Sequence, residues 1–223
     1  MGYGKMIKII YEDNHLLVVE KPINMLVQED NTKDKSLLTE LKEYLKEKYH
    51  KPGNVYLGLV HRLDRPVGGV MVFAKTSKCA SRLSNQIREN KFEKEYLAVI
   101  EGKIKPSQGR LVDNLRKDEK TNMVRVDKDG KISSLTYKTI SCVDNLSLID
   151  ILLETGRSHQ IRVQFSSRKH PLYGDHRYNP NVEENSQIAL WAYKLTIYHP
   201  ITNEKLTFTS KPPQTYPWNL FNI

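Results

Sequence analysis

Residues 55–75 read VYLGLVHRLDRPVGGVMVFAK. Two apolar runs of strand length, 55–60 and 70–75, are typical of central strands covered on both faces. Between them Asp64 is flanked by Arg62 and Arg65, and Gly68-Gly69 allows the chain to turn into the second run. Because arginine stays charged, nearby guanidiniums hold a carboxylate as an anion, which suits a nucleophile better than a proton carrier. We therefore expect Asp64 on a loop at the rim of a sheet.

The rest of the chain alternates strand and helix signals, which predicts an α+β fold. Strands are expected at 7–11, 15–20, 92–100, 135–143, 146–153, 188–198 and 206–209, with further strand character between 107 and 126. Amphipathic helices are expected at 36–45 and 77–90, and Ser158 is a plausible N-cap for a helix that runs to about Ser167. No linker or repeat divides the chain, so we expect a single domain over residues 1–223.

Composition indicates a basic globular protein with a polyanionic partner. The formal net charge is +9, and neutralisation of phosphates supplies most sequence-independent affinity for nucleic acids. The two cysteines, Cys79 and Cys142, have neither disulfide-framework nor zinc-site spacing, which favours a reducing cytoplasm. No apolar stretch reaches the length of a membrane span, and residues 1–5 lack the apolar core of a signal peptide. We expect a cytoplasmic monomer that binds RNA and does not bind membranes.

Four motifs together resemble the RluA-type RNA pseudouridine synthases. Residues 61–75, HRLDRPVGGVMVFAK, resemble the family's HRLDRxTSGxxxxAK motif, whose aspartate is catalytic. Residues 94–102 are similar to its KxYxAxVxG strand, residues 155–163 to its TGRxHQIRVH segment, and residues 11–22 to its opening hairpin ending in Lys-Pro. The chain departs from the family pattern at Val67-Gly68, at Gln164, where histidine is usual, and at 23–25. None of these departures removes a residue with a chemical role.

The resemblance implies both a fold and a reaction. The fold is the pseudouridine synthase fold, a long, mixed, mostly antiparallel sheet with flanking helices and a central active-site cleft, here without a leading S4 domain. The reaction isomerises specific uridines of rRNA or tRNA to pseudouridine on a flipped-out nucleotide. No atom is gained or lost, so no cofactor and no metal are implied.

The resemblance also assigns site residues. Asp64 is the catalytic nucleophile or base, Tyr96 holds the reacting uracil, and Arg162 orients the Asp64 carboxylate. Candidate substrate-binding residues are Arg62, His61, Arg65, Lys21, Arg157 and His159, and candidate phosphate contacts are Lys91, Lys94, Arg110, Arg168, Lys169 and Arg177.

Plainer interpretations stand beside these roles. Asp64 could be a structural ion-pair partner, Tyr96 a core aromatic, and Arg62 only the electrostatic counterpart of Asp64. Lys21 and Arg157 could contact phosphates or form structural pairs. A metal site built from His61, His159, His170 and His176 is disfavoured by their spacing and by adjacent arginines.

Two other classes of protein compete with the synthase. An RNA-binding module would explain the charge but would not need an aspartate between arginines at the end of a core strand. A hydrolase using Asp64 with His61 would need a second placed carboxylate or a metal cluster, and the sequence shows neither pattern.

Overall fold

The structure is a computed structural model that describes residues 7–30, 32 and 34–223. Residues 1–5, which carry the prediction about a signal peptide, lie outside the described residues. The chain forms two compact units, one of residues up to 92 together with 194–210, the other of 93–193 together with 211–223. Each unit combines antiparallel strands with helices, so the α+β class is confirmed. The single domain over 1–223 stays a prediction.

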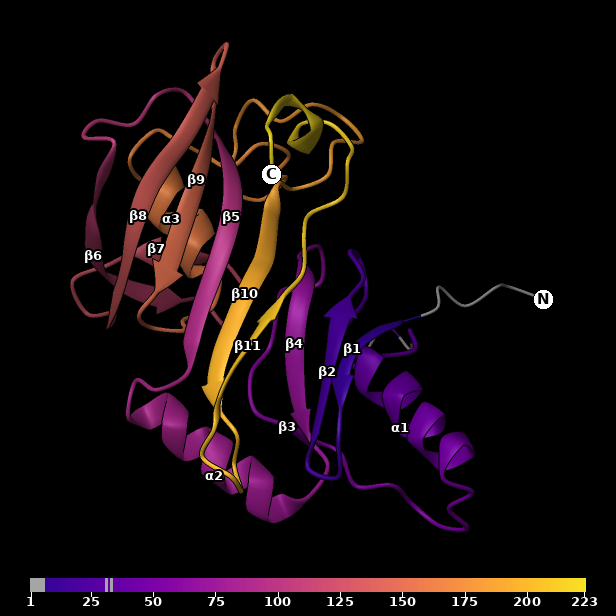
Figure 1. Cartoon of the computed structure of the whole chain (residues 1–223). Helices are drawn as coiled ribbons and strands as arrows, with labels where there is room; N and C mark the ends of the chain where they lie inside the picture. Colours follow the sequence, from indigo (N-terminus) through magenta and orange to yellow (C-terminus); the bar gives the residue numbers. More distant parts are fainter. Residues whose placement is uncertain (1–6, 31, 33) are drawn as a thin grey trace. The chain divides into compact units, whose positions relative to one another are not determined.

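In the first unit, an antiparallel sheet has the order β1-β2-β4 (Figure 1). β1 is Lys8–Glu12, β2 Leu16–Lys21 and β4 Gly68–Ala74. β3 (Gly58–Leu59) pairs with β4, and β11 (Lys205–Thr209) pairs with residues 194–198 of β10 (Leu190–Tyr198). All of β4 is buried, as the apolar run 70–75 predicted, and the apolar residues of β2 are buried as well.

Two helices of the first unit begin at side-chain caps. α1 (Leu37–Lys48) starts after Ser36, whose Oγ accepts a hydrogen bond from the Thr39 N–H at 3.2 Å. Its leucines 37, 41 and 45 are buried, as the helical spacing predicted. α2 (Ser77–Arg88) starts after Thr76, whose hydroxyl accepts from the Cys79 N–H, and it contacts β3 and β4.

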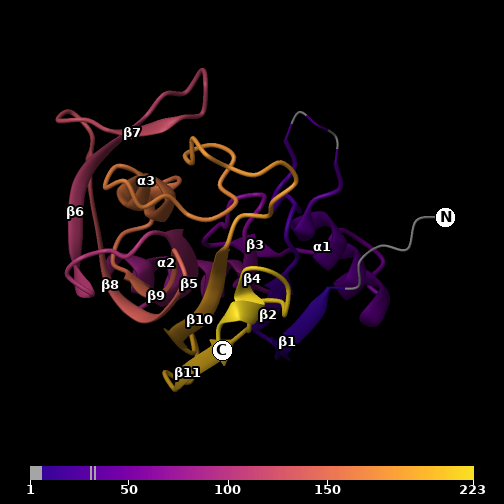
Figure 2. The same ribbon diagram turned by 90° about the horizontal axis from the view of Figure 1, so that it is seen from above.

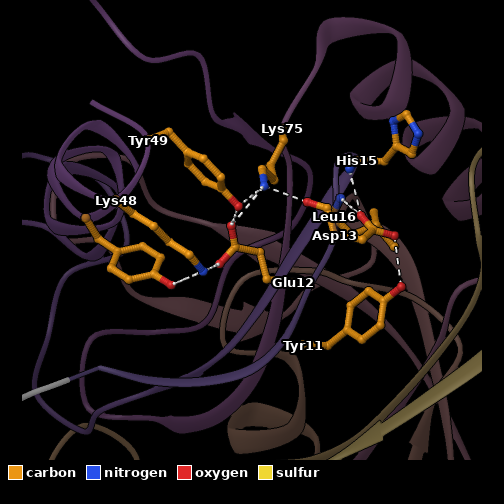
Figure 3. Close-up of polar contacts among 9 residues, drawn as sticks. Tyr11, Glu12, Asp13, His15, Leu16, Lys48, Tyr49 and Lys75 are labelled. Carbon is orange, nitrogen blue, oxygen red and sulfur yellow. Dashed lines mark hydrogen bonds and ion pairs between the residues drawn. The ribbon is translucent and has the colours of Figure 1, made fainter. Parts of the chain in front are cut away.

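A buried carboxylate fixes α1 to the first hairpin (Figure 3). Glu12, at the end of β1, accepts hydrogen bonds from Lys48 Nζ at 2.7 Å, Tyr49 Oη at 2.6 Å and Lys75 Nζ at 2.9 Å. Tyr44 donates a fourth. Burial alone would raise the pKa of Glu12, but these hydrogen bonds outweigh it and lower that pKa to about 2. The cluster is an internal support for this unit.

The first apolar run of the opening stretch is mostly not strand. Only Gly58 and Leu59 pair with β4, because the His61 side chain replaces the next backbone partner. The Val72 N–H of β4 donates to His61 Nε2 at 3.1 Å, so the ladder ends there and the chain leaves the sheet. The expected strand over 55–60 is therefore reduced to two residues.

In the second unit, an antiparallel sheet has the order β5-β9-β8-β6-β7. These strands are β5 (Glu93–Glu101), β9 (Leu146–Leu153), β8 (Lys131–Val143), β6 (Gln108–Lys117) and β7 (Val124–Val126). Strands β8, β6 and β7 curve around the helix α3 (Gln160–Ser166), as Figure 2 shows. A 3-10 turn, Trp218–Leu220, lies near the C-terminus. None of the helices described is long and apolar enough to cross a membrane.

Candidate active site

Asp64 lies on a tight turn between β3 and β4. The Val67 N–H donates to the Asp64 carbonyl at 3.0 Å, which closes the turn over residues 64–67. Leu63 and Val67 are buried on either side of it, whereas Asp64 is partly exposed. Gly69 then has a φ of 121°, a conformation that L residues rarely adopt, where the chain enters β4. Two core anchors thus present a carboxylate at the rim of the sheet, as the sequence predicted.

Lys21 holds this turn from inside the unit. Its side chain is fully buried, and Nζ donates to the carbonyls of Pro22 at 2.9 Å, Arg65 at 3.0 Å and Val67 at 2.7 Å. Burial lowers the pKa of Lys21 to about 7, although the negative charge of Asp64 raises it and Arg65 lowers it further. All three donors of the ammonium are used by carbonyls. These contacts give Lys21 a structural role, and its substrate-binding role stays a prediction.

The two arginines of the motif differ in their surroundings. Arg62 is exposed, and Arg65 donates to Asp34 at 2.6 Å in an ion pair whose side chains are both about half exposed. Exposed pairs contribute little to stability, so RNA could displace Asp34 from Arg65 at small cost. His61 has its Nε2 bound to the Val72 N–H and its ring edge-on to Phe92. Lys21, His61, Asp64 and Arg65 thus belong to one local assembly.

The second group of predicted residues surrounds the start of α3. The helix begins at Gln160 after His159, which has a left-handed backbone with φ 51°, so the predicted N-cap at Ser158 is wrong. The reason is the Gln160 side chain, whose Oε1 accepts from the Arg157 N–H at 3.1 Å and from the Thr155 hydroxyl at 2.7 Å. This amide organises the loop that carries Arg157 and His159.

Arg162 forms a buried bidentate ion pair with Asp175. Its Nε and Nη2 donate to the two carboxylate oxygens at 2.9 and 2.6 Å, and the side chains are 6% and 0% exposed. Asp175 also accepts from the N–H groups of Arg177 and Tyr178. Asp175 was not among the residues predicted from the sequence, where Arg162 was assigned to the Asp64 carboxylate. The proposed action of Arg162 on Asp64 joins residues of different units and stays a prediction.

Tyr96 and Lys94 lie on β5. Tyr96 pairs with Ile151 of β9 and is 7% exposed. Lys94 Nζ is 3.1 Å from the position that a Cβ would take at Gly156. Burial lowers the pKa of Lys94. Lys94 therefore lies beside the loop of residues 155–160, and Tyr96 is held in the sheet by its pairing with β9.

Within the described part of the chain, three of the other candidate phosphate contacts form ion pairs, and two do not. Arg110 pairs with Glu154, Arg168 with Asp113, and Lys91 with Glu89. Arg177 donates to the Asn122 carbonyl at 2.8 Å, and Lys169 is exposed. Among the residues described, no three or more His, Cys, Asp or Glu side chains gather where they could hold a metal ion.

A protein-family model described as RNA pseudouridylate synthase matches residues 15–167, which contain the Asp64 turn, Tyr96 and α3. The chain belongs to this family. The resemblance to RluA-type synthases is thereby confirmed, and with it the class of enzyme: an isomerase that acts on RNA.

Similar curated proteins cover most of the chain. An RNA pseudouridine synthase of Bacillus subtilis is 32% identical over 206 residues, 91% of this chain and 67% of that protein. The ribosomal large subunit pseudouridine synthase D of Zymomonas mobilis is 33% identical over 223 residues, 93% of this chain and 70% of that protein. The ribosomal large subunit pseudouridine synthase C of Buchnera aphidicola from Acyrthosiphon pisum is 34% identical over 177 residues, 78% and 54% of the two chains.

Solved structures show the same fold. The human RNA pseudouridylate synthase domain containing 4 has a TM-score of 0.79 at 22% identity, covering 96% of this chain and 91% of that chain. The human RNA pseudouridylate synthase domain containing 1 has a TM-score of 0.76 at 22% identity, with 97% and 88% coverage. The predicted pseudouridine synthase fold is confirmed.

The departure from the family motif at Gln164 is accommodated inside the second unit. Its side chain is fully buried, donates to Asp113 Oδ2 at 2.7 Å and accepts from Gln160 Nε2 at 3.1 Å. Arg168 donates to the same Asp113 carboxylate. In this synthase, Gln164 therefore connects α3 to β6.

Proposed function

We propose that this synthase isomerises specific uridines of structured RNA, with large-subunit ribosomal RNA as the first substrate to test. The ribosomal RNA is suggested by the names of two of its relatives. Transfer RNA, the other substrate expected from the sequence, is tested beside it.

The observation that carries the proposal is the support of Asp64. The partly exposed Asp64 carboxylate lies on a turn whose carbonyls accept hydrogen bonds from the buried ammonium of Lys21. The start of the turn is fixed by the hydrogen bond between His61 and the Val72 N–H of β4. A reacting group held by buried partners keeps its geometry without reorganisation, and such preorganisation supplies much of the rate of enzymes.

The chemistry assigned to Asp64 needs only the carboxylate and the bound nucleotide. The N1–C1′ bond of uridine breaks, the uracil turns while it stays bound, and a C5–C1′ bond forms. Asp64 either attacks C1′ or removes the 2′ proton to give a glycal, and both routes return the carboxylate at the end. Tyr96 holds the detached uracil, and Arg162 keeps its sequence-derived role of orienting the carboxylate.

Binding draws on the positive side chains. A stacked uridine hides C1′ and C5, so the nucleotide is flipped out at a cost of a few kcal/mol. The exposed Arg62 fills the place of the extruded base. Lys94 is the strongest candidate for a phosphate contact. Among the described residues no carboxylate forms an ion pair with it, and burial destabilises its positive charge, so a phosphate anion would stabilise that charge.

The test uses large-subunit ribosomal RNA and transfer RNA from a strain that lacks the protein. Each RNA is incubated with the purified enzyme, digested and analysed by mass spectrometry. Pseudouridine has the mass of uridine but a glycosidic C–C bond that resists fragmentation. New pseudouridine in the ribosomal RNA alone supports the proposal. New pseudouridine in transfer RNA alone would assign the other substrate, and cleavage products would contradict the isomerase.

A further inference from the structure

We infer that Tyr178 is a positioning residue, fixing the side chains of Arg162 and His159 together. It lies in the segment between α3 and β10, outside the motifs that identified the family. The inference rests on the proposed roles of Arg162 and His159 in the substrate site, and it concerns the second unit alone.

The ring of Tyr178 supports the face of the Arg162 guanidinium. Arg162 Cζ lies 5.1 Å from the ring centroid, within the range of a cation–π contact. The two hydrogen bonds to the Asp175 carboxylate hold the same guanidinium within its plane. The guanidinium therefore has little freedom to rotate, because a carboxylate binds two of its nitrogens and an aromatic ring covers one of its faces.

The hydroxyl of Tyr178 orients His159. The backbone N–H of Val124 donates to Tyr178 Oη at 2.9 Å, and Oη lies 2.7 Å from His159 Nδ1. Burial raises the pKa of Tyr178, so the phenol keeps its proton at neutral pH. With Val124 as donor to the oxygen, the arrangement that satisfies all three groups sends the phenol proton to Nδ1. His159 then carries its proton on Nε2.

The backbone of Tyr178 is fixed to the same helix. Its carbonyl accepts from the Ser166 hydroxyl at 2.7 Å, and its N–H donates to Asp175. The ring packs on the cluster of Leu115, Val124 and Val163. A phenylalanine would fill this space equally well, so packing alone does not require the hydroxyl.

Tyr178→Phe separates the hydroxyl from the ring, and Tyr137→Phe is the matched control. Tyr137 is a buried tyrosine of the same unit whose hydroxyl donates to the Pro106 carbonyl at 2.9 Å, away from Arg162 and His159. We expect Tyr178→Phe to lower kcat about fivefold with little change in KM, the effect of one hydrogen bond. Tyr137→Phe should leave kcat unchanged, and the two variants should melt at similar temperatures.

A double-mutant cycle with His159→Gln gives the decisive comparison. If the hydroxyl acts through His159, Tyr178→Phe has no further effect on kcat in the His159→Gln background. A fivefold loss that persists in that background, or an equal loss in Tyr137→Phe, would overturn the inference. Tyr178→Leu, which also removes the ring from Arg162, should lower kcat at least tenfold beyond Tyr178→Phe, and equal activity of these two variants would overturn the part that concerns Arg162.

NMR of 15N-labelled histidine tests the contact without any turnover. The wild-type protein should show His159 with its proton on Nε2, and Tyr178→Phe should show a mixture of tautomers. An unchanged spectrum overturns the contact. A wild-type protein that forms no pseudouridine overturns the proposed function instead, and the NMR result still decides the contact between Tyr178 and His159.

Discussion

Replacing Arg162 by alanine leaves the Asp175 carboxylate fully buried without its guanidinium. Removing one partner of a buried ion pair costs about 3–5 kcal/mol. Asp175 keeps two backbone donors, the N–H groups of Arg177 at 3.0 Å and Tyr178 at 3.3 Å, which offset part of this cost. We therefore expect a loss near the lower limit, about 3 kcal/mol of unfolding free energy, and a fall in Tm of about 6–12 °C for a chain of this size.

Urea unfolding of three variants measures this loss. Arg168→Ala is the control, because it breaks an ion pair with Asp113 in the same unit whose arginine is 32% exposed. That change should cost less than about 1 kcal/mol. Adding Asp175→Asn to Arg162→Ala removes the stranded charge and should recover at least about 1 kcal/mol. Equal losses for the two arginine variants, or no recovery in the double variant, would show that the unpaired Asp175 charge is not the source of the loss.

Three further predictions concern RNA and pH. Arg62→Ala should leave the Tm nearly unchanged and slow the reaction on structured RNA more than on an unpaired substrate, where flipping is cheap; a defect of equal size on both RNAs would assign Arg62 to the support of Asp64. Affinity for RNA should fall about tenfold or more between about 50 and 200 mM salt, and a flat response in a binding titration would show that shape or base contacts dominate. The lowered pKa of Glu12 contributes stability that is complete above pH 4.5 and is lost as pH falls toward about 2. After discounting for solvent at Lys48, Glu12→Gln should remove about 1–2 kcal/mol at pH 7 and much less at pH 2.5, and a loss that does not depend on pH would contradict this role.

The sequence predicted those elements whose residues carry their own signal. β2 and β4 are near-continuous apolar runs, and α1 combines a serine cap with leucines at helical spacing, so local pattern and tertiary position agree. The Asp64 turn was predicted because an apolar run lies on each side of it and the second run begins at a glycine pair, although the first run forms a strand of only two residues.

The features that the sequence did not predict depend on side chains that bind backbone groups in place of the expected partners. The Val72 N–H is taken by His61, which shortens β3, and Gln160 organises the loop before α3, which displaces the expected cap. The partner of Arg162 is Asp175, thirteen residues later, in a segment without periodicity. A requirement for a carboxylate near a buried arginine can be read from sequence, but the identity of that carboxylate follows only from the path of the loop.

Comparing the activity of Asp64→Asn with that of Asp34→Asn shows whether the Asp64 carboxylate is catalytic. Both changes remove one negative charge from the first unit, and Asp34 is the exposed partner of Arg65. Pseudouridine formed per enzyme is measured by mass spectrometry on the same RNA, with binding measured in parallel. We predict that Asp64→Asn forms none while it folds and binds RNA like the wild type, and that Asp34→Asn remains active. More than a few per cent of wild-type turnover by Asp64→Asn would contradict the catalytic role of this carboxylate.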